Sequence, residues 1–340
     1  MTSRAAIVLA GGSALRFQTQ SQQWQDKALA EIKGKPLIVH VISNLHSIVD
    51  ELVVCVNDEQ RRDQYNQVLE KHGFKSTRFV IDEKNHSVKG PLLAIKSGLH
   101  AVSSTYCLTV PTDMPFIKPS VAEYLLDAVE GFDVVVPMWP DGTLETLIMA
   151  MKKESGTEIT ETLSALNKSR ADTIPRGASK LRLTSPLREI KDLDPELKSF
   201  ININSQDDLT KLESRPTQGK VTENIMFDRG NLTIPDLQLL RNGKKILDEG
   251  KLSEALTIFK DCISNFEKQR AYFWAGVSAE KLAEALLKPS EEQSTAKAKE
   301  TYLNAAKNYE NESKIYKENN CTLLSEQALT DKTLCETQAQ

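Results

Sequence analysis

The first two hundred residues alternate short apolar runs with segments that have helical spacing. The apolar runs are RAAIVLA, ELVVCVN, TRFVI, YCLTV and FDVVVPM, at residues 4–10, 51–57, 77–81, 106–110 and 132–138. The segments with helical spacing lie between them, at residues 36–48, 58–73, 90–102 and 119–129. Strands that alternate with helices indicate βαβ units. The pattern therefore predicts an α/β domain whose mostly parallel sheet is covered by helices on both faces.

The pattern changes after the segment FININSQDDLTKLES, which ends at residue 214. Residues 215–235 contain two prolines and two glycines and few apolar runs, which is typical of a linker. Beyond them, apolar residues recur at helical spacing without β-branched runs. We therefore predict an α/β domain at residues 1–214, a linker at 215–235, an all-helical domain at 236–320 and a frayed tail at 321–340.

Two stretches of the helical part are similar to tetratricopeptide repeats. GKLSEALTIFKDCISNF, at residues 250–266, resembles the second half of such a repeat, and AYFWAGVSAEKLAEALL, at 271–287, resembles the first half of the next. The resemblance implies stacked helix pairs that bind a protein partner. The alternative is a helical hairpin that packs on the α/β domain and stabilises it. Tyr272, Phe273 and Trp274 fit a core better than a binding face.

Composition narrows the possible functions. The 340 residues are 40% hydrophobic and 26% charged, with a formal net charge of −4. Such a chain has no bulk attraction for nucleic acid or for an anionic membrane, so neither is expected as a partner. No stretch approaches the roughly 20 apolar residues of a membrane span, and AAIVLA is too short for a signal peptide. Five cysteines without a CxxC pair argue against a disulfide framework. We expect a cytoplasmic protein.

A glycine pair marks the first candidate site. In IVLAGGSALRF, at residues 7–17, Gly11 and Gly12 follow a predicted strand. Backbone N–H groups exposed in such a turn can bind phosphate oxygens. Arg16 and Lys27 would add positive charge. The plain alternative is a turn that ends a strand, and the segment matches neither the P-loop nor the dinucleotide-binding glycine pattern.

Polar residues also follow the other predicted strands. Asn57 ends one strand, Asp82 follows another, and Asp113 lies in VPTDMPF after a third. Asn202 and Asn204 alternate in FININ and would point to one face of a short strand. Each could simply cap a turn. Together they place polar groups at the carboxyl ends of several strands, where a carboxylate such as Asp113 can hold Mg²⁺ against phosphates.

The order of these segments resembles the molybdenum cofactor guanylyltransferases, the MobA-type nucleotidyltransferases. The resemblance runs from LAGG with its arginine through DKAL, GKPLIVHVISNL, VNDEQ, GPLLAIKSGL, PTDMPF and VVVPMWPDGTLETLIMAM to FININSQDDL, over roughly residues 4–213. It implies a Rossmann-like nucleotidyltransferase fold of the GT-A type. It also implies GTP and the molybdenum–molybdopterin cofactor as substrates, and Mg²⁺ as the metal.

The same resemblance implies roles for individual residues. Lys27, Asp113 and Arg16 would be catalytic, with Asp113 as the Mg²⁺ ligand. The residues implied in nucleotide and cofactor binding are Leu9, Ala10, Gly11, Gly12, Ser13, Lys27, Asn57, Asp82, Asp113, Asn202 and Asn204.

Phosphoryl chemistry suggests how such a site would act. A phosphate is already a nucleophile at neutral pH, so the protein has mainly to position the reactants and neutralise their charge. A cytidylyltransferase, or a nucleotidyltransferase with another phosphorylated acceptor, fits the same residues. A different class of function is a non-catalytic nucleotide-binding protein that acts through its helical part.

Overall fold

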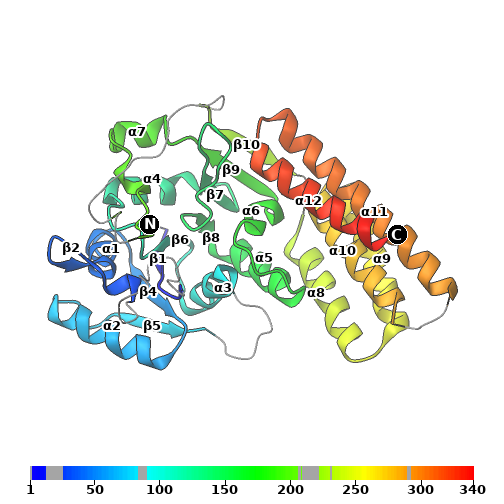
Figure 1. The fold of residues 1–340 in the computed structure, drawn as a ribbon, viewed down its shortest axis with the longest axis horizontal. Helices are drawn as coiled ribbons and strands as arrows, with labels where there is room; N and C mark the ends of the chain where they lie inside the picture. The colour runs from blue at the N-terminus through cyan, green and yellow to red at the C-terminus, as the bar shows by residue number, and fades with distance from the viewer. Residues whose placement is uncertain are drawn as a thin grey trace.

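The computed structural model describes residues 2–12, 26–82, 90–205, 208, 222–229, 232–288 and 292–340. Within these residues the chain forms an eight-stranded sheet with helices on both faces, and then a group of packed helices (Figure 1). The predicted α/β class with a mostly parallel sheet is confirmed, and so is the all-helical part that follows it.

The sheet has the strand order β10-β9-β7-β8-β6-β1-β4-β5. The neighbours of β1 and β4 run parallel to them, whereas β8 and β10 are antiparallel to their neighbours. The strands are β1 Arg4–Leu9, β4 Glu51–Val56, β5 Arg78–Ile81, β6 Tyr106–Pro111, β7 Val134–Pro137, β8 Ala150–Lys152, β9 Lys180–Thr184 and β10 Ile225–Asp228. A separate hairpin consists of β2 Glu31–Ile32 and β3 Lys35–Pro36.

Helices cover both faces of the sheet because its strands are apolar on both sides. Alternate residues of β1 point to opposite faces: Ile7 packs with the core under α3 and α5, and Val8 with the core under α1, α2 and α4. The helices of this part are α1 Leu37–Leu45, α2 Glu59–Lys71, α3 Pro91–Ala101, α4 Pro119–Ala128, α5 Lys153–Ala165, α6 Thr173–Gly177 and α7 Glu189–Leu193, with 3₁₀ turns η2 Lys27–Leu29 and η3 Lys198–Phe200.

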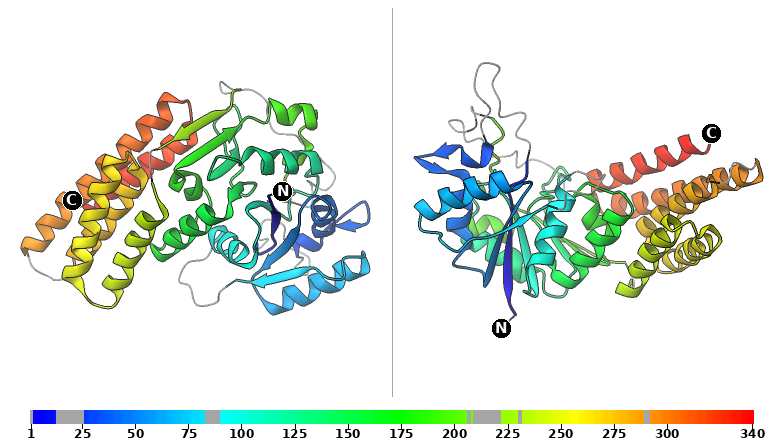
Figure 2. Two further views of the ribbon diagram at one scale, coloured as in Figure 1. Left: turned by 180° about the vertical axis from the view of Figure 1, so that it is seen from behind. Right: turned by 90° about the horizontal axis from the view of Figure 1, so that it is seen from below.

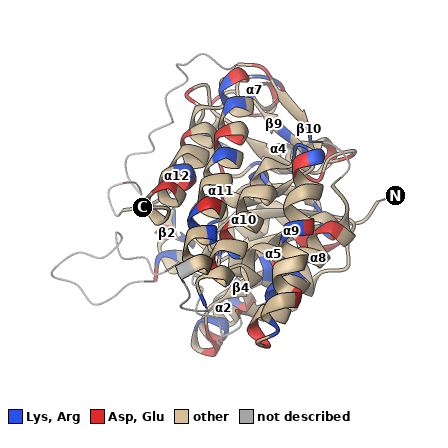
Figure 3. Cartoon of the chain, turned by 90° about the vertical axis from the view of Figure 1, so that its right-hand side faces the viewer, with Lys and Arg blue, Asp and Glu red and all other residues tan. Residues whose placement is uncertain are grey.

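The helical part consists of helices that pack against their neighbours in the chain (Figure 2), and short turns at residues 249–251, 269–271 and 319–321 join three of the pairs. Its helices are α8 Ile234–Asp248, α9 Leu252–Lys268, α10 Tyr272–Leu286, α11 Glu292–Glu318 and α12 Thr322–Gln338. Acidic and basic side chains are interspersed over these helices (Figure 3). No helix among the described residues is both long and apolar enough to cross a membrane.

Two sequence-based boundaries are wrong. The predicted linker contains β10, which pairs with β9 and extends the sheet. The predicted frayed tail is α12, which packs along α11 and buries Leu324 and Ala328. The apolar residues of α12 are few and widely spaced in sequence, so their pattern does not predict a helix. The helix is stabilised mainly by its packing along α11.

The helical part shares a hydrophobic core with the sheet domain. Trp274 of α10 is almost fully buried and donates from its indole Nε1 to the carbonyl oxygen of Gly177 over 2.8 Å. It belongs to the same core as Ile159 of α5 and Ile174 of α6. Arg176, at the end of α6, is paired with Glu312 of α11. These contacts favour the second sequence-based alternative, in which the helices pack on the catalytic domain and stabilise it.

Candidate active site

The predicted site residues follow four adjacent strands at one edge of the sheet. Gly11 follows β1, Asn57 follows β4, Asp82 follows β5, and Asp113 lies just beyond β6. These strands are neighbours in the order β5-β4-β1-β6 and run parallel, so their carboxyl ends lie together. The strand order reverses between β1 and β6, which is where open α/β sheets bind ligands.

Lys27 and Asp113 form the centre of this edge. The Lys27 ammonium lies 2.7 Å from Asp113 Oδ2 and donates to Asn204 Oδ1 over 2.9 Å. The Lys27 and Asp113 side chains are 16% and 19% exposed, so the pair is screened from bulk water but still reachable by a ligand. Three residues that span 177 positions of the chain thus form one polar cluster at this edge of the sheet.

Asp26 fixes the backbone that carries Lys27. Its Oδ1 accepts from the backbone N–H of Ala28 and caps the 3₁₀ turn η2, while its Oδ2 accepts from the Tyr65 hydroxyl over 2.8 Å. The Arg61 guanidinium lies 3.5 Å from the same oxygen. Tyr65 and Arg61 were not predicted as site residues, because both lie within a polar helix, α2, whose pattern gives no sign of which face meets the site.

The glycine loop is held by Asn57 and Arg61. Asn57 Nδ2 donates to the carbonyl oxygen of Gly11, and Arg61 donates to that of Gly12 over 3.0 Å. A Cβ at Gly11 would lie 2.4 Å from Asn57 Oδ1, so any other residue there would displace the Asn57 side chain. Around Gly12 the space is open. The loop therefore presents bare backbone at the site, as expected of a phosphate-binding turn.

Leu9 and Ala10 lead into this loop. Both are almost fully buried, and the Leu9 carbonyl accepts from the backbone N–H of Thr112 over 3.1 Å. This bond ties the end of β1 to the segment that carries Asp113. Leu9 and Ala10 can therefore meet a ligand only through backbone groups. Ser13 and Arg16, the other predicted residues of this loop, lie outside the described residues.

Three buried oxygen atoms at this edge have no hydrogen-bond partner among the described residues: Asp82 Oδ1, Asp113 Oδ1 and Asn202 Oδ1. Burial raises the pKa of Asp82 to about 6, partly offset by a hydrogen bond from Ser97. Unpaired buried acceptors are costly, so each of these oxygens is a candidate to accept from a ligand or to bind a cation.

The asparagine segment lies against Asp113. The backbone N–H of Ile203 donates to the Asp113 carbonyl over 2.8 Å, and the side chain of Ile203 is buried. Asn202 and Asn204 alternate with Ile201 and Ile203, as predicted, but residues 201–204 form no strand. The predicted strand is wrong because this backbone pairs only locally with the Asp113 turn and joins neither sheet.

An aromatic contact supports the same segment from behind. The ring of Phe200 packs edge-on against Trp139, with centroids 5.6 Å apart. Trp139 is buried and donates from Nε1 to Glu145 Oε1 over 2.7 Å. Trp139 and Glu145 lie on the connection from β7 to β8. They were not predicted, since nothing in the sequence alone brings this loop next to Phe200.

The residues present fit a magnesium ion. Mg²⁺ is usually held by one or two carboxylates together with substrate phosphates and water, and Asp113 offers one buried, unpaired carboxylate oxygen beside a phosphate-binding loop. No group of three or more His, Cys, Asp or Glu side chains in the described part of the chain could hold a metal by itself. The site therefore suits an ion that arrives with a nucleotide.

Comparison with known proteins identifies the class. Residues 6–180 match the MobA-like NTP transferase domain. This is an α/β nucleotidyltransferase domain, and it accounts for more than half of the chain. The protein belongs to the MobA-like NTP transferase family.

Two relatives and one solved structure are consistent with this family assignment. The chain is 32% identical over 211 residues to the probable molybdenum cofactor guanylyltransferase of Methanosarcina acetivorans, covering 62% of this chain and 90% of the relative. It is 30% identical over 150 residues to the molybdenum cofactor guanylyltransferase of Shewanella putrefaciens, covering 44% of this chain and 69% of the relative. The molybdopterin-guanine dinucleotide biosynthesis protein A of Archaeoglobus fulgidus has the same fold, with a TM-score of 0.50, 24% identity and coverage of 62% and 96%.

Proposed function

We propose that the protein transfers GMP from GTP to the phosphate of the molybdenum–molybdopterin cofactor and releases pyrophosphate. The names of its relatives support this substrate pair. The observation that carries the proposal is the cluster of Lys27, Asp113 and Asn204 at the carboxyl ends of β1 and β6. It combines a cation, a carboxylate with a free buried oxygen and an amide beside an open glycine loop.

In the reaction, a phosphate oxygen of the pterin attacks the α-phosphorus of GTP, and the bond to the pyrophosphate leaving group breaks. The chain's own work is to align the two phosphates and to neutralise charge. The Gly11–Gly12 backbone would bind phosphate oxygens. The Lys27 ammonium, now balanced by Asp113, would turn to the incoming triphosphate, whose negative charge outweighs that of one carboxylate.

Asp113 would hold Mg²⁺ through Oδ1, and the ion would neutralise charge on the triphosphate. Asn57 and Asp82 would line the nucleotide site on the side of β4 and β5, and Asn202 and Asn204 would lie nearer the pterin. Asp26 and Tyr65 act through Lys27 and are positioning residues.

The decisive experiment measures pyrophosphate release from GTP with the isolated pterin cofactor. We expect Asp113→Ala to abolish Mg²⁺-dependent turnover and Lys27→Met to lower kcat by about 10²–10³-fold, the usual cost of losing one charge-stabilising group. Both variants should keep the circular dichroism spectrum of the wild type. Lys71→Met removes an exposed lysine at the far end of α2 and is the matched control. Wild-type turnover in Asp113→Ala would remove this residue from the site.

Calorimetric titration with GTP, CTP and ATP tests the nucleotide. We expect GTP to bind most tightly. A preference for CTP would place the protein among the cytidylyltransferases. Nucleotide binding without pyrophosphate release, with cofactor present, would favour a non-catalytic binding protein.

We also propose that α8–α12 are tetratricopeptide-like helix pairs and that their surface away from the sheet binds a protein. Exposed leucines on α11 and α12 support the proposal: Leu303, Leu329 and Leu334. Leu303→Lys and Leu334→Lys should then abolish binding of that partner without lowering the melting temperature. A loss of stability instead would make these leucines part of the fold.

A further inference from the structure

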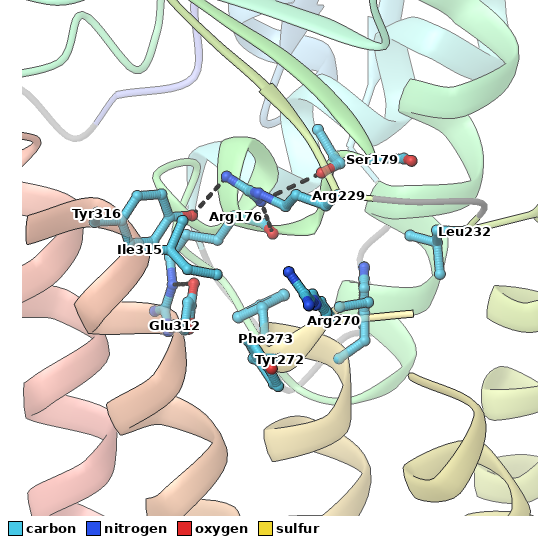
Figure 4. Close-up of a pocket in the computed structure, with 13 residues that line it drawn as sticks. Arg176, Ser179, Arg229, Leu232, Arg270, Tyr272, Phe273, Glu312, Ile315 and Tyr316 are labelled. Atoms are coloured by element: carbon cyan, nitrogen blue, oxygen red, sulfur yellow. Dashed lines mark hydrogen bonds and ion pairs between the residues drawn. The ribbon is translucent and has the colours of Figure 1, made fainter. Parts of the chain in front are cut away.

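Asp194 is a buried carboxylate outside the polar cluster of the candidate active site. It follows α7, its side chain is fully buried, and the Lys118 ammonium lies 2.9 Å from its Oδ1. It thus resembles Glu312, the buried carboxylate that pairs with Arg176 (Figure 4). The Glu312 pair joins the helical part to the sheet domain, and the Asp194 pair likewise joins two separate segments of the chain.

Three polar contacts form a closed ring around Asp194. Its Oδ2 accepts from the backbone N–H of Ser199 over 2.7 Å, and Ser199 Oγ accepts from the backbone N–H of Lys118 over 3.0 Å. The Lys118 ammonium closes the ring at Asp194 Oδ1. Ser199 is fully buried, whereas the Lys118 side chain is 40% exposed. We call Asp194, Ser199 and Lys118 the clamp.

The clamp favours the ionised form of its carboxyl group. Burial would raise the pKa of Asp194, but hydrogen bonds from Ser199 and Lys118 outweigh it and hold the pKa below its ordinary value. Asp194 is therefore a carboxylate at neutral pH. A buried ion pair is often no more stabilising than a well-packed apolar pair, and its better-attested use is to fix the register of the segments that it joins.

The two segments joined by the clamp meet a second time at the candidate active site. Lys118 lies five residues after Asp113, and Ser199 lies four residues before Ile203. The Ile203 N–H donates to the Asp113 carbonyl over 2.8 Å. Residues 113–118 and 199–203 are therefore tied to each other at both ends.

A small apolar core lies beside these ties. Ile201 and Ile203 are buried in it with Ile32 and Leu37, and Phe116 packs against them. Apolar packing alone leaves the register of an irregular segment weakly specified. A slip of one residue would bring an isoleucine to the position of an asparagine, so a directional contact such as the clamp is needed to fix the register.

We propose that the clamp is a positioning device and that Asp194 sets the place of residues 201–204 relative to Asp113. Asn204 then reaches the Lys27 ammonium, to which it lies at 2.9 Å. The consequence for catalysis rests on the proposed function, in which the asparagines of this segment lie near the pterin. Without the clamp the nucleotide side of the site stays in place, but the acceptor side is displaced. A displacement of about 1 Å can cost roughly 10²-fold in rate.

Hydrogen exchange tests the positioning without any substrate. The Ile203 N–H reports whether its segment stays on Asp113, because it exchanges when the two separate locally. Asp194→Ala should speed this exchange. Asp194→Asn should keep it slow, since the amide oxygen still accepts from the Ser199 N–H. Leu163→Ala is the matched control: it removes a buried leucine of α5 on the other face of the sheet, so it should lower the melting temperature and leave Ile203 exchange unchanged.

Steady-state kinetics with GTP and the isolated pterin cofactor test the consequence. Asp194→Ala should raise the KM for the pterin by about 10–10²-fold, with the KM for GTP unchanged. Asp194→Asn should recover most of that loss, and Leu163→Ala should keep both KM values.

Several outcomes would overturn the proposal. They are Ile203 exchange or a pterin KM that is unchanged in Asp194→Ala, a rise in pterin KM that Leu163→Ala shares, and a loss that Asp194→Asn does not recover. A wild-type protein that releases no pyrophosphate would contradict the proposed function instead, and Ile203 exchange would then decide by itself whether the clamp positions the segment.

Discussion

Glu312→Ala tests whether the sheet domain and the helical part are one folding unit. Glu312 and Arg176 are 6% and 3% exposed, and both carboxylate oxygens accept from the guanidinium. Arg176 also lies over the Phe273 ring, 4.6 Å from its centroid, and contacts Asp331 at 2.7 Å. Burial opposes its charge, but the two carboxylates raise its pKa well above the usual value. Removing Glu312 leaves this buried cation with one partner.

The expected cost follows from that geometry. Removing one member of a buried ion pair lowers the free energy of unfolding by about 3–5 kcal/mol. For 340 residues that unfold together, the unfolding entropy is about 0.7 kcal/mol per kelvin, so the melting temperature should fall by about 4–7 °C. Differential scanning calorimetry measures this shift. It should also show a single transition, because Arg176 belongs to the sheet domain and Glu312 to the helices.

Two controls isolate the buried pair. Glu310→Ala removes an acidic residue of the same helix that is 39% exposed and pairs with Lys314 and Lys332, and it should change stability by less than about 1 kcal/mol. The double variant Arg176→Met/Glu312→Leu removes both charges and should recover most of the loss. If Glu312→Ala behaves like Glu310→Ala, or if the helices melt in a transition of their own, the two parts do not form one unit.

Three further predictions follow from the site and the core. Burial raises the pKa of Asp82 to about 6 from an ordinary value of 3.8. The Asp82 carboxyl should therefore make the fold more stable as pH falls from about 6 to 3.8. Over the same interval GTP affinity should fall, because the carboxylate becomes protonated. Asp82→Asn should remove both effects in pH-dependent unfolding and titration, and an unchanged pH profile would contradict the assignment. Trp139→Phe removes the hydrogen bond from the indole Nε1 to the buried Glu145, so it should destabilise the fold by about 1–3 kcal/mol and raise the KM for the pterin, with the KM for GTP unchanged; equal changes in both KM values would contradict the positioning role. A chain that ends at residue 214 lacks β10 and α8–α12, so it should expose the apolar surface of α5 and aggregate on purification, whereas a soluble, active fragment would show that the sheet domain folds alone.

Much of the fold could be predicted from periodicity. The strands β1, β4, β5, β6 and β7 and the helices α1–α4 fall where the apolar runs and helical spacing place them, because each run is bounded by polar or turn residues and alternates with a helical segment. The short antiparallel strands β8 and β10 were missed. Both are antiparallel to their neighbours, which an alternation of strands and helices does not predict. β8 lies between β7 and β6, and β10 pairs with β9 at the edge of the sheet, so both depend on tertiary pairing.

The residues of the candidate site also include some that could be predicted from sequence and some that could not. Gly11, Asn57, Asp82 and Asp113 could be placed together from sequence, because parallel strands bring their carboxyl ends to one edge. The contact of Lys27 with Asn204 could not be derived from any pattern, since it depends on how two irregular segments fold over that edge. The residues that support the site from the side, Tyr65 and Trp139, depend on tertiary packing alone.

The helical part also contacts one loop that supports the candidate site. The connection from β7 to β8 carries Trp139, which supports Phe200, two residues before Asn202. The same connection contains Gly142, whose left-handed backbone lies so close to α12 that a Cβ there would be 3.1 Å from the backbone nitrogen of Thr322. The start of α12 thus limits where this loop can move. A change in how the helices pack would shift the loop, then Phe200, and then the asparagines beside Asp113. The helical part therefore contributes to the geometry of the site even though none of the proposed catalytic side chains lies within it.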